Sequence, residues 1–391
     1  MTSTAKKLSP LCARDPEEAH RAATQLELFF DLVSVIAIAA IAAGLHHAIA
    51  EGHGFEKLPV FIFFFIAAWW AWMNFTWFAS AFDNDGPLYR LLVMVIMAGE
   101  LIFAAGAGHM FETLDVGWGV IGWTVMRAGM ASLWFLTAMN PEWRATALRY
   151  GFGILVAQGL WILFYFLAPR DLHSFLLFGS FCFLFEFFVP PFAERARATP
   201  FHRHHIIERY GLLTIISLGE IMLSISLGFG SLYEGAEHGL PLGAISTALS
   251  AFVIGFSLFW IYFVEEDHLP NRNFWTAFIW GYGHLFIFAT IAAIGAGVAA
   301  ELDLVARHSA VSASVLAWWL GAPLALFCFF LWIVRDRYFD LGFRGFALPA
   351  IAVVSLAAAA AGASTPMFAV IAVVGVLWRV PMRLAALDGG A

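Results

Sequence analysis

The chain has 391 residues, of which 61% are apolar and only 13% are charged. Water-soluble domains are about one half apolar and about one quarter charged, so the composition excludes an ordinary soluble protein and predicts a polytopic membrane protein. The net charge of −7 decides little, because in a membrane chain the placement of charges matters more than their sum. Cys12, Cys182 and Cys328 have the spacing of neither a metal site nor a disulfide framework.

Twelve apolar runs are long enough to cross a bilayer, which takes about 20 residues at about 1.5 Å of rise per residue. The residues before the first run are polar, so we expect this run to serve as an uncleaved signal anchor. The sequence therefore predicts an all-α integral membrane protein with about 12 transmembrane helices. The predicted spans are 26–50, 58–82, 88–110, 116–138, 149–168, 172–191, 206–230, 242–264, 274–300, 311–334, 345–361 and 365–384.

Lysine and arginine test this layout, because the cytoplasmic loops of membrane proteins carry an excess of basic residues. With the N-terminus inside, 17 of the 21 basic residues fall in cytoplasmic segments or adjoining helix ends. Only Lys57, Arg170 and Arg307 fall outside, and Arg127 is the single one deep within a span. The distribution predicts a multi-pass protein of the bacterial cytoplasmic (inner) membrane with both termini in the cytoplasm.

The second half of the chain weakly repeats the first. Glu27 opens the first predicted helix and Glu208 the seventh, and Gly99-Glu100-Leu101 corresponds to Gly283-His284-Leu285. Two parallel six-helix halves are typical of secondary transporters, whose substrate site lies between the halves near the midplane. The predicted organisation is a cytoplasmic N-terminal segment (1–25), a first half (26–191), a cytoplasmic linker (192–205), a second half (206–384) and a C-terminal tail (385–391).

Two carboxylates lie at the start of the first predicted helix. Glu27 and Asp31 are four residues apart, which places them on one face, about one turn from each other. Thr24-x-x-Glu27 fits a capping box, so Glu27 is interpreted either as a helix cap or as a functional group. Asp31 lies a turn deeper, which favours a functional or buried-pair role.

The seventh predicted helix begins with His205, Glu208 and Arg209 and carries Glu220 near its centre. His205 shares a face with Glu208 and Arg209, although Glu208 in a first turn also suits a helix dipole. Glu220 lies about 18 Å beyond Glu208, where a bare carboxylate would cost several kcal/mol. We therefore expect Glu220 to face the bundle interior, in a polar site shared with Asp31 or Glu100. The histidines lack a recognised zinc spacing, so no metal site is predicted.

These two stretches carry a family resemblance. Glu27-Leu-Phe-Phe-Asp31-Leu-Val and His205-x-x-Glu208-Arg209-x-Gly-Leu, continued by Leu218-Gly219-Glu220, look like the two signatures of the bacterial low temperature requirement protein A family. The resemblance extends over nearly the whole chain in length and helix number. Ser34, Ser217 and Met222 depart from the pattern, and Ser34 stands where a large apolar residue is usual. The resemblance implies a polytopic membrane protein and no defined catalytic mechanism.

Three more ionisable residues lie within predicted spans. A guanidinium in mid-membrane is too costly to leave bare, so we expect Arg127 to pair with Glu100, Glu220 or Asp31. His284 is interpreted either as a hydrogen-bonded core histidine or as a proton-relay group. Glu186, just before Pro190-Pro191, is expected to be a half-exposed carboxylate near the inner interface, with a site role as the secondary interpretation.

Aromatic and small residues give packing predictions. Most of the 41 Phe and 16 Trp, with the cluster Trp69-Trp70-x-Trp72 among them, are expected to face lipid or to form interfacial belts. The small-residue runs 104–108 and 295–297 are expected to mark close helix packing.

The leading hypothesis is a secondary transporter or proton-coupled permease for an ion or small polar solute. The chain lacks a phosphate loop, a Gly-x-Ser-x-Gly elbow, a haem motif and a nucleotide fingerprint, so neither an ATP-driven pump nor a cofactor is predicted. The lipid bilayer and a small solute are the expected partners, and nucleic acid is not. Substrate or proton-coupling residues would be Asp31, Glu100, Arg127, Glu208, Glu220 and His284, with Glu27, His205, Arg209 and Glu186 as secondary candidates.

Two other classes are kept as alternatives. An intramembrane enzyme acting on a lipid or isoprenoid-linked substrate would use His205, Glu208 and Arg209 as acid–base or phosphate-binding groups. A non-catalytic membrane sensor or assembly factor is the third class. Enzymatic activity is the less expected outcome, and no catalytic residue is assigned.

Overall fold

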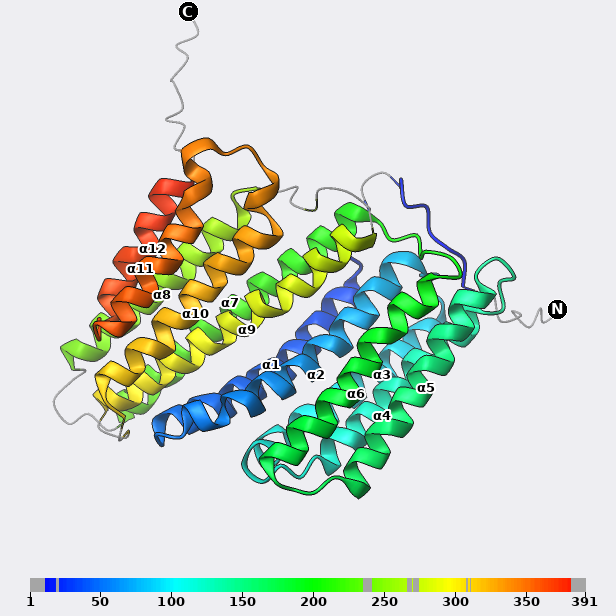
Figure 1. Cartoon of the computed structure of the whole chain (residues 1–391), viewed down its shortest axis with the longest axis horizontal. Helices are drawn as coiled ribbons and strands as arrows, with labels where there is room; N and C mark the ends of the chain where they lie inside the picture. Colours follow the sequence, from blue (N-terminus) through cyan, green and yellow to red (C-terminus); the bar gives the residue numbers. More distant parts are fainter. Residues whose placement is uncertain are drawn as a thin grey trace, which may run out of the picture. The chain divides into compact units, whose positions relative to one another are not determined.

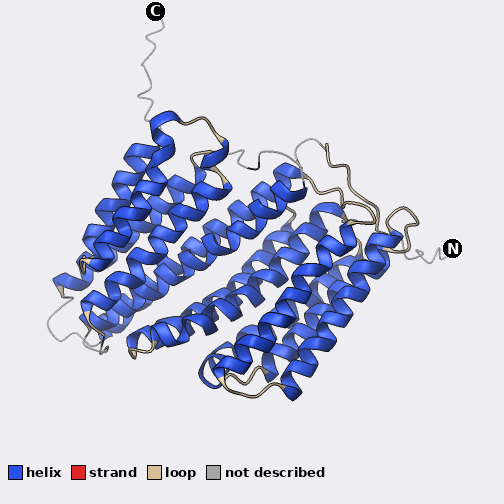
Figure 2. Cartoon of the chain, viewed as in Figure 1, coloured by secondary structure: helices blue, strands red, loops and turns tan. Residues whose placement is uncertain are grey.

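The computed structural model of the chain contains helices and, within the residues that it describes, no strand beyond a single bridge between Ala13 and Phe82 (Figure 2). It describes residues 11–18, 21–234, 241–265, 269, 274–306, 309 and 311–380.

Twelve α-helices lie in this part of the chain, where the apolar runs predict them (Figure 1). Eleven described helices are long and apolar enough to cross a membrane, counting α11 together with the 3-10 turn before it. The prediction of an all-α, multi-pass membrane protein is therefore confirmed. The helices are α1 (Gln25–Ala50), α2 (Gly54–Ala81), α3 (Pro87–Thr113), α4 (Gly117–Thr137), α5 (Arg144–Leu167), α6 (Leu172–Glu194), α7 (Arg203–Glu234), α8 (Leu242–Phe263), α9 (Phe274–Val305), α10 (Ala313–Val334), α11 (Ala347–Ala360) and α12 (Thr365–Arg379).

The last predicted span, 365–384, is too long. α12 ends at Arg379, and Val380 has extended backbone angles (φ −82°, ψ 125°). The cause is Pro381, because a residue that precedes proline is driven out of the helical region. The 15 residues of α12 extend about 22 Å, which is less than the roughly 30 Å of a hydrocarbon core. Residues 381–384 lie outside the described part of the chain.

Contacts divide the chain into two compact units. Unit 1 comprises Met1–Gly44 and Pro59–Arg209, and unit 2 comprises Leu45–Leu58 and Tyr210–Ala391. In unit 1, α4 packs against α3 and α5, and α5 also packs against α6. In unit 2, α10 packs against α9 and α11, while α12 packs against α8 and α11. The predicted domain ranges and the parallel repeat stay predictions.

The tryptophan cluster of α2 lies inside unit 1 rather than against lipid. Trp69, Trp70 and Trp72 are 0–1% exposed, so the expectation that this cluster faces lipid is wrong. A buried indole needs an acceptor for its N–H. The Trp70 indole donates to Glu186 and the Trp72 indole to Asp31, so polar partners hold both rings in the interior.

Glycine allows α3 and α4 to approach closely. A Cβ atom at Gly99 would lie 2.6 Å from the Gly122 carbonyl oxygen, and one at Gly122 would lie 2.6 Å from the Gly99 oxygen. The predicted small-residue contacts hold at Gly106 against Trp118 and at Gly297 against Trp319. At Gly108 a Cβ atom would meet nothing within 4 Å, so this glycine makes no close contact.

Gly99→Ala should lower the free energy of unfolding by about 1–3 kcal/mol, because the added methyl group meets backbone that must shift. Gly108→Ala on the same helix is the matched control and should stabilise the helix by about 0.5–1 kcal/mol. Thermal unfolding of the purified protein in detergent, followed by circular dichroism, measures both. Equal stability of Gly99→Ala and wild type would contradict the close approach.

Candidate functional site

The first turn of α1 forms the predicted capping box. The Thr24 N–H donates to Glu27 Oε2 at 2.7 Å, and the Glu27 N–H donates to Thr24 Oγ1 at 3.2 Å. The second carboxylate oxygen, Oε1, faces positively charged groups instead. One oxygen therefore caps the helix, as predicted, and the other takes part in an ion cluster, while a functional role of Glu27 stays a prediction.

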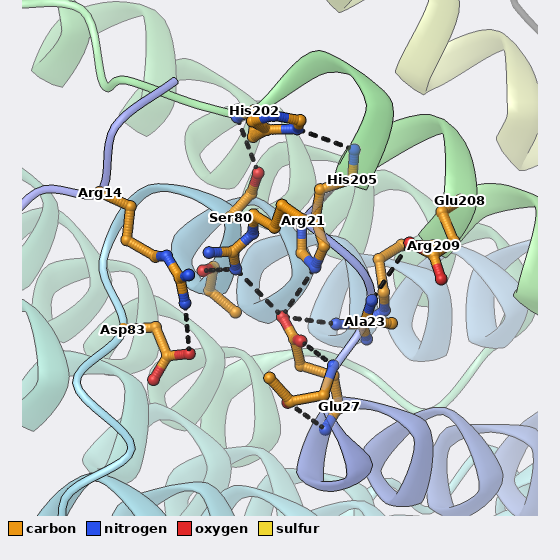
Figure 3. Close-up of polar contacts among 12 residues, drawn as sticks. Arg14, Arg21, Ala23, Glu27, Ser80, Asp83, His202, His205, Glu208 and Arg209 are labelled. Atoms are coloured by element: carbon orange, nitrogen blue, oxygen red, sulfur yellow. Dashed lines mark hydrogen bonds and ion pairs between the residues drawn. The ribbon is translucent and has the colours of Figure 1, made fainter. Parts of the chain in front are cut away.

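This inner cluster consists of Arg21, Glu27, Asp31, His205 and Arg209 (Figure 3 shows the part around Glu27). The Arg209 guanidinium binds both carboxylates: Nη1 lies 3.2 Å from Glu27 Oε1, and Nη2 lies 2.6 Å from Asp31 Oδ1. His205 Nε2 lies 3.1 Å from Glu27 Oε1, and Arg21 Nη2 lies 3.7 Å from the same oxygen. Asp31 also accepts the Trp72 indole N–H at 2.6 Å.

The inner cluster is buried and balanced in charge. All five side chains are buried, and two guanidinium groups face two carboxylates. Burial lowers the pKa of Arg21, while the Glu27 carboxylate acts against this shift. Removing one charge from such a cluster would leave its partner uncompensated away from water, which is strongly destabilising. The cluster therefore holds the start of α1 and the start of α7 in fixed positions.

The segment before α1 is tied to the end of α2 next to this cluster (Figure 3). The Arg14 backbone N–H donates to the Ala81 carbonyl at 2.9 Å, and its guanidinium lies 3.2 Å from Asp83. Burial raises the pKa of the Asp83 carboxyl, and Arg14 acts in the opposite direction. The backbone N–H of His202, the residue directly before α7, donates to Ser80 Oγ of α2 at 3.0 Å.

Glu208 binds the segment that precedes α1. Its side chain accepts the backbone N–H of Ala23 at 3.1 Å, whereas His205 and Arg209 contact Glu27. Among the described residues, no group of three or more His, Cys, Asp or Glu side chains is arranged to hold a metal ion.

Glu100 is buried on α3, where Ser34 is its hydrogen-bond partner. Its exposed fraction is 3%, and Glu100 Oε2 lies 2.8 Å from Ser34 Oγ. Ser34 Oγ in turn lies 3.1 Å from the Phe30 carbonyl oxygen. The described part of the chain offers Glu100 Oε1 no hydrogen-bond partner and offers the carboxyl no cation.

Arg127 does not have the partner that the sequence predicts. Its Nη2 lies 2.9 Å from Glu186 Oε1, so the expected pairing with Glu100 or Asp31 is wrong, and the expected pairing with Glu220 of unit 2 stays a prediction. Glu186 is 1% exposed, which also overturns its predicted half-exposed position. The indole N–H groups of Trp70 and Trp161 donate to Glu186 at 3.0 and 3.2 Å. The Arg127 guanidinium lies 4.6 Å from the Trp123 ring centre, which adds a cation–π contact.

His284 and Glu220 belong to unit 2. His284 Nδ1 lies 2.7 Å from the Trp280 carbonyl and Nε2 lies 3.1 Å from Tyr262 Oη, an arrangement that fits a neutral ring with its proton on Nδ1. This geometry is that of a hydrogen-bonded core histidine. The Glu220 side chain is half-buried on α7. Its shared site with Asp31 or Glu100 stays a prediction, because those two residues belong to unit 1.

A second buried ion cluster, in unit 2, escaped the sequence analysis. Asp336 lies 2.6 Å from Arg335 Nε and 2.7 Å from Arg379 Nε, and Arg379 also reaches Glu265 at 3.1 Å. Arg335 Nη1 donates to the Ile261 carbonyl oxygen, which ties this cluster to the end of α8. Both arginines count in the sequence only as cytoplasmic basic residues. The sequence signal that could have indicated this cluster is Arg335-Asp336, an adjacent pair of opposite charges directly after the apolar run 311–334.

Arg127→Ala should lower the free energy of unfolding by about 3–5 kcal/mol, because it leaves the Glu186 charge unpaired inside unit 1. The double variant Arg127→Met, Glu186→Leu should recover most of this loss. Arg197→Ala is the control, since its partner Glu142 is about half exposed and such a pair is worth at most about 1 kcal/mol. Unfolding midpoints and folded yield test the pair; equal effects of the Arg127 and Arg197 variants would contradict it.

Comparisons with known proteins agree with this architecture. The family model of the bacterial low temperature requirement A protein (LtrA) matches residues 22–380. The chain is also similar to the uncharacterized protein RA0937 of Rhizobium meliloti (strain 1021), with 24% identity over 331 residues that cover 79% of this chain and 76% of that protein. The family match includes both motifs and every residue of the inner cluster except Arg21. The chain therefore belongs to the bacterial low temperature requirement A family.

Proposed function

We propose that the protein is a proton-coupled secondary transporter for an ion or small polar solute, and that Glu100 binds the coupling proton. The observation that carries the proposal is the environment of Glu100, a carboxyl that is buried at 3% exposure with one hydroxyl partner and no cation. An ionisable side chain in such a place within a membrane helix is expensive to maintain, so it points to a function.

The Ser34 hydroxyl can form a hydrogen bond with Glu100 whether Glu100 is ionised or protonated. The Ser34 hydroxyl has one hydrogen and two neighbouring acceptors, the Phe30 carbonyl oxygen and Glu100 Oε2. When Glu100 is ionised, Ser34 donates to it. When Glu100 is protonated, Glu100 donates to Ser34 Oγ and Ser34 donates to the Phe30 carbonyl. Rotation of one hydroxyl group therefore accommodates both protonation states without movement of the backbone.

The other candidate residues take supporting parts in this proposal. The paired residues Asp31, Arg209, Arg127 and Glu186 would hold the helices of unit 1 in place. Glu220 and His284, which belong to unit 2, stay predicted site residues. An enzyme at the inner surface is less well supported, because His205 and Arg209 are fully buried in contacts with Glu27 and Asp31. No contact of the described residues favours a sensor over a transporter.

Glu100→Gln should abolish solute-driven proton uptake in proteoliposomes that contain a pH-sensitive dye, because the amide cannot exchange a proton while its shape is retained. The panel of solutes comprises amino acids, sugars, organic acids and inorganic cations. Glu112→Gln is the matched control, since Glu112 is an exposed carboxylate on the same helix. Proton uptake that is equal in the Glu100 variant and in the control would contradict the proposal.

A second measurement needs no substrate. Infrared difference spectra of the wild type between acid and alkaline pH should contain a protonated-carboxyl contribution from Glu100. This contribution should be missing in Glu100→Gln and present in Glu112→Gln. If the spectra of the two variants are the same, Glu100 is not a proton site, whatever the solute is.

We also propose that both termini face the cytoplasm of the bacterial inner membrane, as the 17 basic residues on one side indicate. In a cysteine-free background, His53→Cys in the loop before α2 should react with a membrane-impermeant maleimide in intact spheroplasts. Asn84→Cys in the loop before α3 should react only after permeabilisation. Both positions are exposed, so accessibility within the protein does not limit the reaction. The reverse pattern would invert the topology.

A further inference from the structure

A carboxyl group in unit 2 joins three helices. Glu301 lies near the end of α9 and is half-buried, whereas its two partners, Thr247 of α8 and Thr365 of α12, are buried. Thr247 Oγ1 donates to Glu301 Oε1 at 3.2 Å, and Thr365 Oγ1 donates to Oε2. Neither family motif includes Glu301. The carboxyl group therefore ties α9 both to α8 and to the start of α12.

No cation among the described residues neutralises Glu301. The two threonines are the only side chains of these residues that act on its ionisation. Asp303, two residues further along α9, binds His46 instead, with 2.6 Å between Oδ2 and Nε2. Arg307 and His308, which follow α9, lie outside the described part of the chain. A carboxyl group without a cation in a membrane helix is less costly when it is protonated, so Glu301 can take up a proton.

The hydrogen bonds of Glu301 depend on whether it carries a proton. An ionised carboxylate accepts from both threonine hydroxyls, and a hydroxyl binds a charged acceptor more strongly than a neutral one. Once Glu301 is protonated, its own hydrogen needs an acceptor, and a threonine that accepts it must turn its hydrogen away. Within the described part of the chain, neither threonine hydroxyl has a second acceptor, unlike Ser34, which has the Phe30 carbonyl. Protonation therefore weakens at least one of the two contacts.

The two ends of α12 are held in different ways. Thr365 is the first residue of this short helix, so its contact with Glu301 fixes the start. The other end is held by Arg379, which binds Asp336 at 2.7 Å and Glu265 at 3.1 Å. That end is fixed by opposite charges, whereas the start depends on one carboxyl group without a cation. A proton can therefore loosen the start of α12 more readily than its end.

We propose that Glu301 is a proton-binding site of unit 2 and that its protonation loosens the start of α12. Glu301 is four residues before the end of α9, or about 6 Å, at the end that the basic residues assign to the outside. Protons from outside the membrane would therefore supply this site. This role of Glu301 depends on contacts within unit 2 and not on the role of Glu100.

Carbodiimide labelling of the full-length protein in detergent locates the proton. Dicyclohexylcarbodiimide adds to a protonated carboxyl group and leaves a stable N-acylurea, which peptide mass spectrometry assigns to a residue. Glu301 should be labelled in acid and should lose most of the label in alkali. Asp336 is the matched control, because two arginines neutralise this buried carboxylate of the same unit, and it should stay unlabelled. Labelling of Glu301 that does not exceed that of Asp336 would overturn the proton site, and labelling of Glu100 is measured separately on its own peptide.

Hydrogen exchange tests the link to α12. The backbone N–H groups of Met367 and Phe368 both donate to the Ser364 carbonyl, so their exchange reports on the start of the helix. Protection relative to the intrinsic exchange rate should fall about fivefold from neutral to acid pH, the factor for one hydrogen bond. Glu301→Gln should show no such fall, and residues 313–320 of α10 should show none in either protein, which confirms that the variant folds. Protection that is independent of pH in the wild type, or that falls equally in Glu301→Gln, would overturn the link.

Discussion

The bridge that Arg209 forms between Glu27 and Asp31 is the interaction on which the polar interior of unit 1 depends. Carboxylates four residues apart on one helix lie about one turn from each other, and the planar guanidinium has N–H groups enough to bind both. A lysine ammonium is a compact charge without this fork, so it could not replace the bridge. Since both carboxylates are buried, the bridge fixes how the start of α7 meets α1. His205 and the Trp72 indole bind the same two carboxylates.

The positions of the helices could be predicted because the bilayer imposes a length of about 20 apolar residues, and the sequence contains that signal directly. The partners of the buried charges could not be predicted from the sequence. Which carboxylate meets Arg127 depends on which helices are neighbours and on how each is rotated, and hydropathy contains neither. Glu186, just before Pro190-Pro191, was expected to be half-exposed near the inner interface, yet α6 continues through both prolines to Glu194. Glu186 is eight residues from that end, or about 12 Å, which places it well inside the span.

The sequence analysis misjudged two features for the same physical reason: hydrogen bonds to buried carboxyl groups hold aromatic and polar side chains in the protein interior. Trp70 and Trp72 were counted among the aromatic residues expected to face lipid or to form interfacial belts, but their N–H groups bind buried carboxylates. Ser34 was noted only as a departure from the family pattern, although it is the residue that contacts Glu100. A small polar residue in place of a large apolar one within a membrane helix is a sign of a polar neighbour on another helix. The sequence therefore indicates a polar contact at Ser34, but it does not indicate that the partner is Glu100.

The buried carboxyls of unit 1 differ in their capacity for a coupling reaction. Glu27, Asp31 and Glu186 each face an arginine, so protonation of any of them would leave an unpaired buried guanidinium. Their charges are therefore fixed, and they serve to hold helices together. Glu100 faces a hydroxyl group, and neither of its protonation states leaves a buried charge of opposite sign without a partner. A proton-coupling site must be able to change its protonation state. Among these four carboxyls, only Glu100 can do so without leaving a buried arginine unpaired.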